Sequence, residues 1–173
     1  MREVFITGTG RRLPGSPIPS EAMEAHLGFI GGRPSALGRR ALRWNGIETR
    51  HYAIDPDGRA QTSNAAMCAE AVAAALEDAG RDAGALGFMA AATTQGDLLV
   101  PGHASAVHGE LAAHGAGAME VASFQSVCAS SLMAAKAAWL NVRCGEHGVA
   151  AACAGEFSSR WFRPSFYEGC LLY

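Results

Sequence analysis

The sequence has few charged residues, no long apolar run and no closely spaced pair of cysteines. Charged side chains make up 17% of its 173 residues and hydrophobic ones 49%, which excludes a disordered polyelectrolyte. The formal charge of -2 gives no basic excess of the kind found in nucleic-acid-binding proteins. No run approaches the roughly 18 apolar residues that cross a membrane. The composition therefore predicts a soluble chain of single-domain size that binds neither nucleic acid nor a membrane.

Cysteine usage favours free thiols over a disulfide framework. The count is five, an odd number, and no Cys-x-x-Cys pair occurs. No secretory apolar segment follows Met1, because charged residues begin at Arg2. We therefore expect reduced thiols, a cytoplasmic protein and no structural zinc site. The histidines add no metal signal, since His103 and His108 are five residues apart rather than four.

A glycine pair near the amino end indicates no cofactor. Gly8 and Gly10 follow a short β-rich run, as in dinucleotide-binding loops. The third glycine of that motif would stand at position 13, which is Leu13, and Pro14 prevents a helix from starting there. We expect neither a cofactor nor a metal.

Apolar runs alternate with helix-like segments along the chain. The expected strands are Val4–Thr7, Leu86–Thr93, Met119–Val127, Val149–Ala154 and the short run Cys170–Tyr173. The expected helices are Glu21–Leu27 capped by Ser20, Leu37–Trp44, a long one from a cap at Thr62 or Ser63 to Ala79, Pro101–Ala113 and Ala129–Val142. A turn is expected at Asp55–Gly58. This alternation predicts a layered α/β fold with a mainly parallel sheet.

Cys128 stands where the expected strand Met119–Val127 gives way to the expected helix Ala129–Val142. A helix amino terminus directs unpaired N–H groups and partial positive charge at this position, which favours a thiolate and the oxyanion formed during acyl transfer. Cys128 is therefore a candidate nucleophile. The alternative is a small cysteine buried in a strand–helix turn. The other cysteines are expected to be structural; they are Cys68, Cys144, Cys153 and Cys170.

Two groups of arginines are candidate anion-binding sites. The first comprises Arg39, Arg40, Arg43 and Arg50, and the second comprises Arg160 and Arg163 among aromatic residues. Guanidinium groups suit either a phosphate or the carboxylates of an acidic carrier protein. The alternative is that both groups form ordinary solvated surfaces.

Five segments, in order, resemble type III β-ketoacyl synthases of the thiolase superfamily. They are Ile6–Gly10 with Leu13 and Pro14, Asn45–His51, Ala91–Thr94 followed by Pro101, Val127–Ser131, and Gly155–Arg160. The resemblance implies that residues 1–173 form the amino-terminal half of a thiolase-like α/β/α fold. The histidine and asparagine that drive decarboxylation in this family lie in its second half, and no residue here matches them. We therefore expect this chain to be a fragment of a longer protein, or to be completed by a second polypeptide.

The resemblance implies an acyltransferase or condensing enzyme of fatty-acid or polyketide type. Cys128 would form an acyl thioester, which is then condensed with a malonyl extender on acyl carrier protein. The backbone N–H of Cys128 would bind the oxyanion. Val100 corresponds to a residue that reaches the partner's acyl pocket across a homodimer interface. Two alternatives stay open: a cysteine acyltransferase that makes esters or amides, and a non-catalytic partner subunit.

Two positions depart from the family's pattern. The family has arginines that contact coenzyme A where Trp44 and Tyr167 stand here, although Arg43 and Arg163 lie nearby. This departure favours acyl carrier protein over acyl-coenzyme A as the donor. The expected substrate-binding residues are Val100, Arg43, Trp44 and Arg163.

Overall fold

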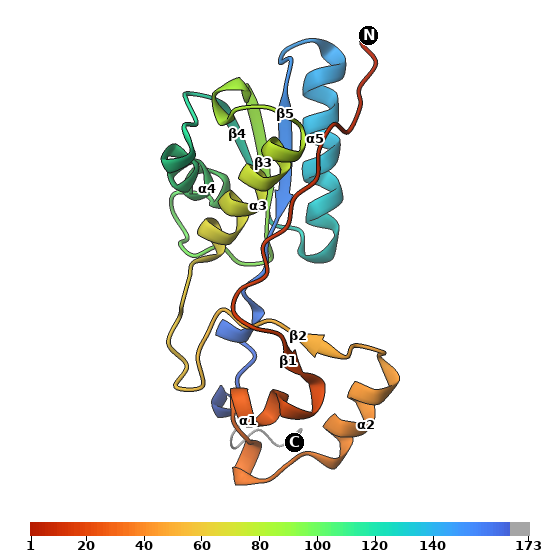
Figure 1. Cartoon of the computed structure of the whole chain (residues 1–173), viewed down its shortest axis with the longest axis vertical. Coiled ribbons are helices and arrows are strands. Elements are labelled where there is room, and N and C mark those ends of the chain that lie inside the picture. Colours follow the sequence, from red (N-terminus) through yellow and green to blue (C-terminus); the bar gives the residue numbers. More distant parts are fainter. Residues whose placement is uncertain (167–173) are drawn as a thin grey trace. The chain divides into compact units, whose positions relative to one another are not determined.

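The computed structural model describes residues 1–166, except for the side chains of 36, 37, 39 and 165. The chain divides into two compact units (Figure 1). The layered unit comprises Met1–Arg12 and Ser63–Glu156, and the small unit comprises Leu13–Thr62 and the described residues after Glu156. The expected strand Cys170–Tyr173 lies outside the described residues. Among the described helices, none has the length and apolar content needed to cross a bilayer.

The layered unit is built on a three-stranded parallel sheet. Strand β3 (Phe88–Ala92) lies between β4 (Glu120–Phe124) and β5 (Ala150–Ala154). The strands are in register, so that Ala92 at the end of β3 faces the last residues of both neighbours. The predicted α/β fold with a parallel sheet is confirmed, and the carboxyl ends of all three strands meet at one edge.

Helices cover both faces of this sheet (Figure 1). Helices α3 (Asn64–Asp78) and α4 (His103–Leu111) pack on one face and α5 (Ser130–Cys144) on the other. Successive side chains of β3 enter opposite layers, as the twofold period of a strand requires. Met89 and Ala91 pack with α3 and α4, while Phe88, Ala90 and Ala92 pack with α5. Burial on both faces explains why this strand is an uninterrupted apolar run.

The outer strands differ from the sequence expectation. The segment Met119–Val127 was expected to be one buried strand, but β4 spans only Glu120–Phe124, and its residues are half-buried or exposed. Among the described residues β4 pairs on one side only, and that accounts for its exposure.

The expected helix Pro101–Ala113 is shorter in the structure than predicted, because α4 begins after Gly102 and is followed by a 3₁₀ turn, Ala112–His114.

The expected first strand, Val4–Thr7, is wrong. Within the described residues this segment pairs with no strand, and Ile6 is 90% exposed. The chain instead passes along α3, where a Cβ at Gly8 or Gly10 would overlap the helix backbone. The β-rich composition was real, but a strand also requires a neighbouring strand to bond. The glycine pair therefore serves a close helix contact.

Helix ends follow the predicted signals in one case and not in another. The Ser63 hydroxyl accepts the N–H of Ala66 at 2.9 Å, which confirms the cap at the amino end of α3. Gly80, just beyond the carboxyl end of α3, adopts the left-handed φ of +63°. Ser20 does not cap a helix. It begins a 3₁₀ turn, and its hydroxyl donates to the carbonyl of Ile47.

The small unit contains short elements. Strand β1 (Ile18–Pro19) pairs antiparallel with β2 (Thr49–Arg50), and helices α1 (Met23–Leu27) and α2 (Ala36–Trp44) lie between them in the sequence. Its described part also contains four 3₁₀ turns: Ser20–Ala22, Ile30–Gly32, Ser158–Arg160 and Pro164–Phe166.

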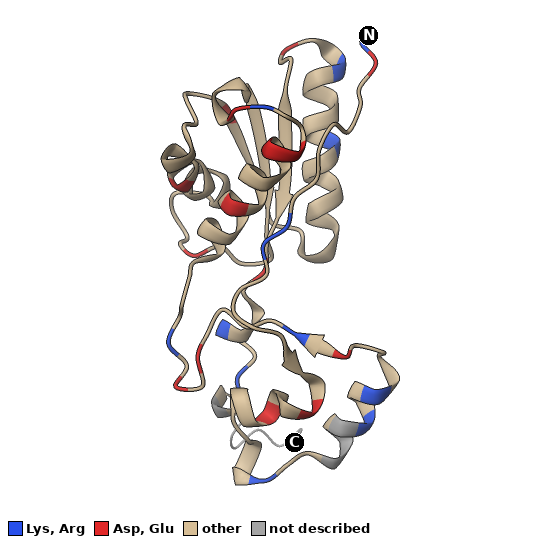
Figure 2. Ribbon diagram, viewed as in Figure 1, with Lys and Arg blue, Asp and Glu red and all other residues tan. Residues whose placement is uncertain are grey.

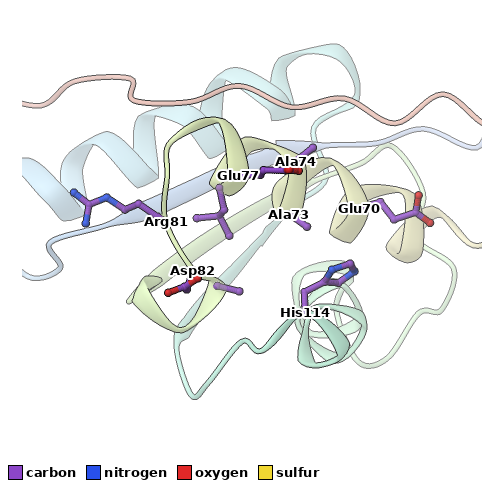
Figure 3. Close-up of a pocket in the computed structure, with 9 residues that line it drawn as sticks. Glu70, Ala73, Ala74, Glu77, Arg81, Asp82 and His114 are labelled. Atoms are coloured by element: carbon purple, nitrogen blue, oxygen red, sulfur yellow. The ribbon is translucent and has the colours of Figure 1, made fainter.

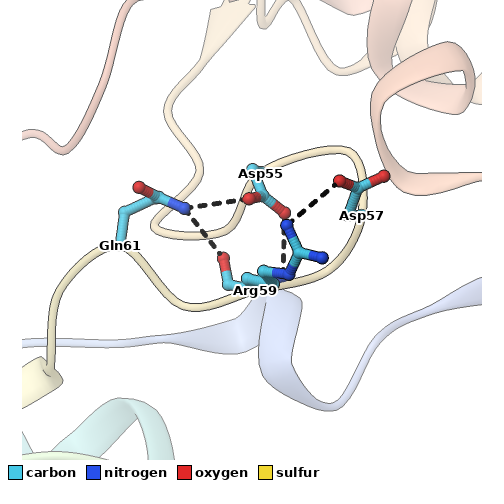
Figure 4. A network of polar contacts seen from close by, with 4 residues as sticks. All are labelled: Asp55, Asp57, Arg59 and Gln61. Carbon is cyan, nitrogen blue, oxygen red and sulfur yellow. Dashed lines mark hydrogen bonds and ion pairs between the residues drawn. The ribbon is translucent and has the colours of Figure 1, made fainter.

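The predicted turn at 55–58 is present and is closed by polar contacts (Figure 4). Asp55 accepts the backbone N–H of Arg59 at 2.8 Å and the side-chain amide of Gln61 at 3.0 Å. Gly58 takes a φ of +80°, and its N–H donates to the carbonyl of Asp55. These contacts make the turn a structural feature of the small unit.

Candidate active site at Cys128

Cys128 lies on a strand–turn–helix junction of the layered unit. Strand β4 ends at Phe124, a 3₁₀ turn spans Val127–Ala129, and α5 begins at Ser130. The thiol of Cys128 is exposed, which excludes the alternative of a cysteine buried in the turn. The predicted placement between strand and helix is confirmed, at the carboxyl edge of the parallel sheet.

The turn before Cys128 has an unusual backbone. Val127 has a φ of +50°, in the left-handed region, which costs a non-glycine residue roughly 1–2 kcal/mol. Ser130 braces this turn: its hydroxyl donates to the carbonyl oxygen of Val127 at 2.6 Å, and the residue is only 3% exposed. A side-chain bond from the first helical residue thus helps to hold the conformation that presents Cys128 to solvent.

The surroundings of the thiol combine a helix terminus with apolar surface. The first turn of α5 holds no acidic residue, so nothing in that turn opposes the partial positive charge of the helix amino end. Three apolar side chains beside Cys128 are exposed: Val127 at 60%, Leu132 at 75% and Met133 at 44%. This combination suits a thiolate nucleophile and a ligand with an apolar acyl group.

A buried polar network joins the ends of two strands at the same edge. Asn64, which is fully buried, donates its amide N–H groups to Thr93 Oγ1 at 2.9 Å and to the carbonyl of Gly155 at 3.2 Å. A Cβ at Gly155 would overlap the Cys68 thiol and lie 2.6 Å from the Asn64 amide oxygen. Glycine is therefore needed after β5 for the network to close.

Two carboxylates complete this edge. Glu156 accepts both the backbone N–H and the hydroxyl of Thr94 at 2.7 Å, which ties the residues after β5 to those after β3. Asp97 accepts the backbone N–H groups of Asn64 and Ala65 at 3.1 and 2.8 Å, at the start of α3. The sequence analysis missed these roles, because the partners are 62 and about 33 residues apart and no local spacing links them.

Val100 and Cys128 belong to the layered unit. Val100 is 84% exposed in the segment between β3 and α4, beside Leu99 at 97%. Such exposure leaves both side chains available to another molecule. The role of Val100 at an acyl pocket stays a prediction.

The other expected substrate-binding residues belong to the small unit. Arg43 and Trp44 end helix α2, and Trp44 is 78% exposed. Arg163 is engaged inside its own unit, since its guanidinium donates to the carbonyls of Ser159 at 3.2 Å and Gly58 at 2.6 Å. Its role in substrate binding stays a prediction, and so do those of Arg43 and Trp44.

The remaining described cysteines differ in exposure. Cys68 is buried, Cys153 is half-buried in β5, and Cys144 is exposed at the end of α5. A hydrogen bond with Cys153 and then burial raise the pKa of the Cys68 thiol far above its ordinary value of 9.0, while the contact with His103 at 3.6 Å lowers it. Cys68 is thus held as a neutral thiol.

Five of the histidines make side-chain contacts with groups other than Cys128. His103 is buried, at 2% exposure. Three others bind backbone carbonyls, namely His26 to Ile54, His51 to Pro14 and His108 to Gly117, and His147 pairs with Glu120. Within residues 1–166, no histidine is hydrogen-bonded to Cys128, and no group of three or more metal-ligating side chains gathers.

A surface hollow of about 530 Å³ lies along α3 (Figure 3). Its polar lining includes Glu77, Arg81, Asp82 and His114, and also Glu70, which pairs with Arg12. None of the candidate site residues lines it. Its mixed charges give no reason to prefer it over the Cys128 junction as a site of chemistry.

Solved structures share this fold. AbyA1, a tetronic acid condensing enzyme, matches with a TM-score of 0.77 and 20% identity over 95% of this chain and 47% of its own. The 3-oxoacyl-[acyl-carrier-protein] synthase III of Aquifex aeolicus matches with a TM-score of 0.68 and 19% identity over 89% of this chain and 45% of its own. ChlB3, described as an acyltransferase, matches with a TM-score of 0.62 and 19% identity over 82% of this chain and 37% of its own.

These matches establish the fold. The chain shares the α/β fold of these structures, and it spans about half of their length or less. No family model matches the sequence. At identities near 20%, fold similarity alone does not transfer an activity.

Proposed function

We propose that this chain carries the nucleophile of an acyltransferase or condensing enzyme of fatty-acid or polyketide type. The observation that carries the proposal is the exposed Cys128 on a braced strand–turn–helix junction, at the amino end of a helix of 15 residues. The fold match to a 3-oxoacyl-[acyl-carrier-protein] synthase III and to a tetronic acid condensing enzyme supports it.

The first chemical step is acyl transfer to sulfur. The Cys128 thiolate attacks the carbonyl carbon of a donor thioester, a new C–S bond forms and the donor's C–S bond breaks. The proton of the Cys128 thiol passes to the released donor thiolate. The oxyanion of the tetrahedral intermediate is stabilised by the backbone N–H of Cys128 and by the helix terminus.

The second step is condensation. Loss of carbon dioxide from a malonyl group on acyl carrier protein gives a carbanion, which attacks the acyl carbon and releases the Cys128 thiolate. By the resemblance, a histidine and an asparagine of the second half of the fold assist this step. We propose that residues 1–173 supply the first half of the fold and that the complete enzyme is a homodimer. We also propose that it is cytoplasmic, because unpaired cysteines are suited to a reducing compartment.

Transfer of the acyl group to a hydroxyl or an amine is the second candidate. The match to ChlB3, an acyltransferase by its description, favours it. The Cys128 step is the same in both candidates, so one experiment tests their common part. A non-catalytic partner subunit is disfavoured, because it would have no use for an exposed cysteine at this position.

The experiment measures release of free thiol from acetyl donors. We expect the protein to release thiol from acetyl-acyl carrier protein faster than from acetyl-coenzyme A, because Trp44 replaces a coenzyme-A-binding arginine of the family. Cys128→Ala should abolish this release, and Cys144→Ala, a change at another exposed cysteine, should not. Release by Cys128→Ala at the wild-type rate would refute the proposed function, and equal rates for the two donors would refute the donor preference.

A further inference from the structure

Two cysteines that the proposed chemistry does not use meet inside the layered unit. Cys68 lies on α3 and Cys153 lies on β5. Cys153 packs against the core cluster that contains Cys68, and the two thiols are hydrogen-bonded. Gly155 follows Cys153 by two residues and so faces the same side of the strand, and a Cβ at Gly155 would overlap the Cys68 sulfur. Both observations place the Cys68 sulfur on the side of β5 that Cys153 faces.

The two thiols differ in their access to solvent. Cys68 is 2% exposed, whereas Cys153 is half-buried. Among the described residues β5 pairs with β3 alone, so its other edge carries no strand there. A small solute therefore meets Cys153 before it meets Cys68. The hydrogen bond with Cys153 and then burial raise the pKa of the Cys68 thiol, so that Cys68 keeps its proton while its partner is reduced.

A buried histidine stands beside the inner thiol. The Nε2 atom of His103 lies 3.6 Å from the Cys68 sulfur, and the residue is 2% exposed. The other ring nitrogen, Nδ1, is also buried and has no hydrogen-bond partner within the described part of the chain. An imidazole next to a thiol favours its deprotonation. Cys68 thus has a second thiol as one neighbour and a group that can take up its proton as another.

The surroundings of the pair are uncharged. Neither β5 nor residues 64–69 of α3 contain a charged side chain, and β5 carries neither of the charge colours in Figure 2. A disulfide is uncharged and fits such a layer, whereas a sulfinate would place a negative charge in it. Thiols and imidazoles also ligate metals, but no group of three ligating side chains converges in the part of the chain that the structure describes. The arrangement therefore suits the formation of a disulfide.

We propose that Cys68 and Cys153 form an intrachain disulfide when the protein meets hydrogen peroxide, and that Cys153 reacts first. The Cys153 sulfur attacks a peroxide oxygen, the O–O bond breaks, and water leaves with the thiol proton, which gives a sulfenic acid. The Cys68 sulfur then attacks the Cys153 sulfur and the S–O bond breaks. The proton of Cys68 passes through His103 Nε2 to the departing hydroxide, which leaves as water. Peroxide is reduced and the two thiols are oxidised.

The disulfide does not depend on the proposed function, because Cys128 takes no part in it. It would fasten α3 to β5 beside the hydrogen bond from Asn64 to the carbonyl of Gly155. That hydrogen bond belongs to the network at the carboxyl edge of the sheet. Oxidation would therefore add a covalent link behind this edge.

The experiment maps disulfides in the folded 173-residue protein after treatment with hydrogen peroxide. Remaining thiols are blocked with N-ethylmaleimide in acidic urea, and peptides are analysed by mass spectrometry without reductant. We expect two peptides joined through Cys68 and Cys153, with the loss of two hydrogens, which a reductant separates. Cys153→Ser should abolish this product, whereas Cys144→Ser, a matched change outside the pair, and Cys128→Ala should form it to the wild-type extent. Circular dichroism shows whether each variant remains folded.

The order of the two steps is tested by trapping the sulfenic acid. Cys68→Ala should leave Cys153 as a sulfenic acid, which dimedone captures, while the wild-type protein gives the linked peptides instead. His103→Gln should slow the linking step and increase capture by dimedone. Linking of His103→Gln at the wild-type rate would overturn the role of His103, and capture on Cys68 in place of Cys153 would overturn the order.

The wild-type protein alone decides the proposal, so an unfolded variant does not prevent the test. In concentrated urea the two cysteines are no longer held together, and their linkage should lose its preference over other pairings. An equal preference in urea would overturn the proposal. Complete oxidation of Cys128 and Cys144 while Cys68 and Cys153 stay reduced would overturn it as well. A sulfinic acid on Cys153 without any linkage, or loss of the linkage in Cys128→Ala, would lead to the same conclusion.

Discussion

Two exposed cysteines lie near opposite ends of α5, so the effect of the helix dipole on a thiol can be tested within one molecule. Cys128 lies in the 3₁₀ turn two residues before the first residue of α5, Cys144 is the last residue of α5, and both cysteines are exposed. The perturbation is alkylation by iodoacetamide at neutral pH, which consumes thiolate. The helix field favours negative charge at the first position and disfavours it at the second.

The size of the effect follows from the helix dipole. A negative charge at the amino or carboxyl end of a helix is stabilised or destabilised by about 0.3–1 kcal/mol, so the two ends differ by about 0.6–2 kcal/mol for the charge that develops during alkylation. This difference corresponds to alkylation of Cys128 roughly 3–30 times faster than of Cys144. Peptide mapping at several times of reaction gives both rates from one sample. Cys68 should remain unmodified in the folded protein, because it is buried.

The comparison contains its own control. In concentrated urea the helix is absent, and the two rates should become similar. Faster alkylation of Cys144 than of Cys128 in the folded protein would show that the helix terminus does not activate Cys128. Equal rates in both conditions would lead to the same conclusion.

Two further predictions concern the buried network behind the strand ends. Gly155→Ala should lower the free energy of unfolding by about 2–5 kcal/mol, because the added Cβ overpacks against Cys68 and disrupts the Asn64 hydrogen bonds. The control is Gly109→Ala in α4, where a Cβ meets nothing within 4 Å. This control should raise the free energy of unfolding by about 0.5–1 kcal/mol. Urea titration measures both, and equal effects would contradict the packing argument. Because the pKa of Cys68 is raised in the folded state, its contribution to stability is complete below the ordinary thiol value of 9.0 and is lost as pH rises above it. Unfolding titrations should therefore show stability falling above pH 9.0 by up to about 1.4 kcal/mol per pH unit, and Cys68→Ala should remove this dependence.

Sequence patterns were sufficient to predict the features that depend on residues within one segment. Strand β3 is apolar throughout because both of its faces are covered, and its position was predicted closely. The position of Cys128 followed from the order of strand, turn and helix. The capping serine of α3 was among the two predicted cap positions, because a cap acts within a few residues of the helix end.

The errors arose where structure depends on distant neighbours. Val4–Thr7 has strand composition, but within the described residues no strand pairs with it, and composition does not reveal whether a neighbour exists. The expected strand Met119–Val127 was too long because the pairing of β4 with β3 ends at Phe124, and Val127 beyond it has a positive φ. The Asn64 and Glu156 contacts could not be found at all, since each joins residues far apart in sequence.

Direct detection of the acyl group on Cys128 is the measurement closest to the central claim. The protein is incubated with acetyl-acyl carrier protein, digested at acidic pH to preserve thioesters, and its peptides are analysed by mass spectrometry. We predict one acetyl group, on the peptide that contains Cys128, removable by hydroxylamine and absent from Cys128→Ala. Acetylation of Cys144 with Cys128 unmodified, or no thioester on any cysteine, would contradict the account.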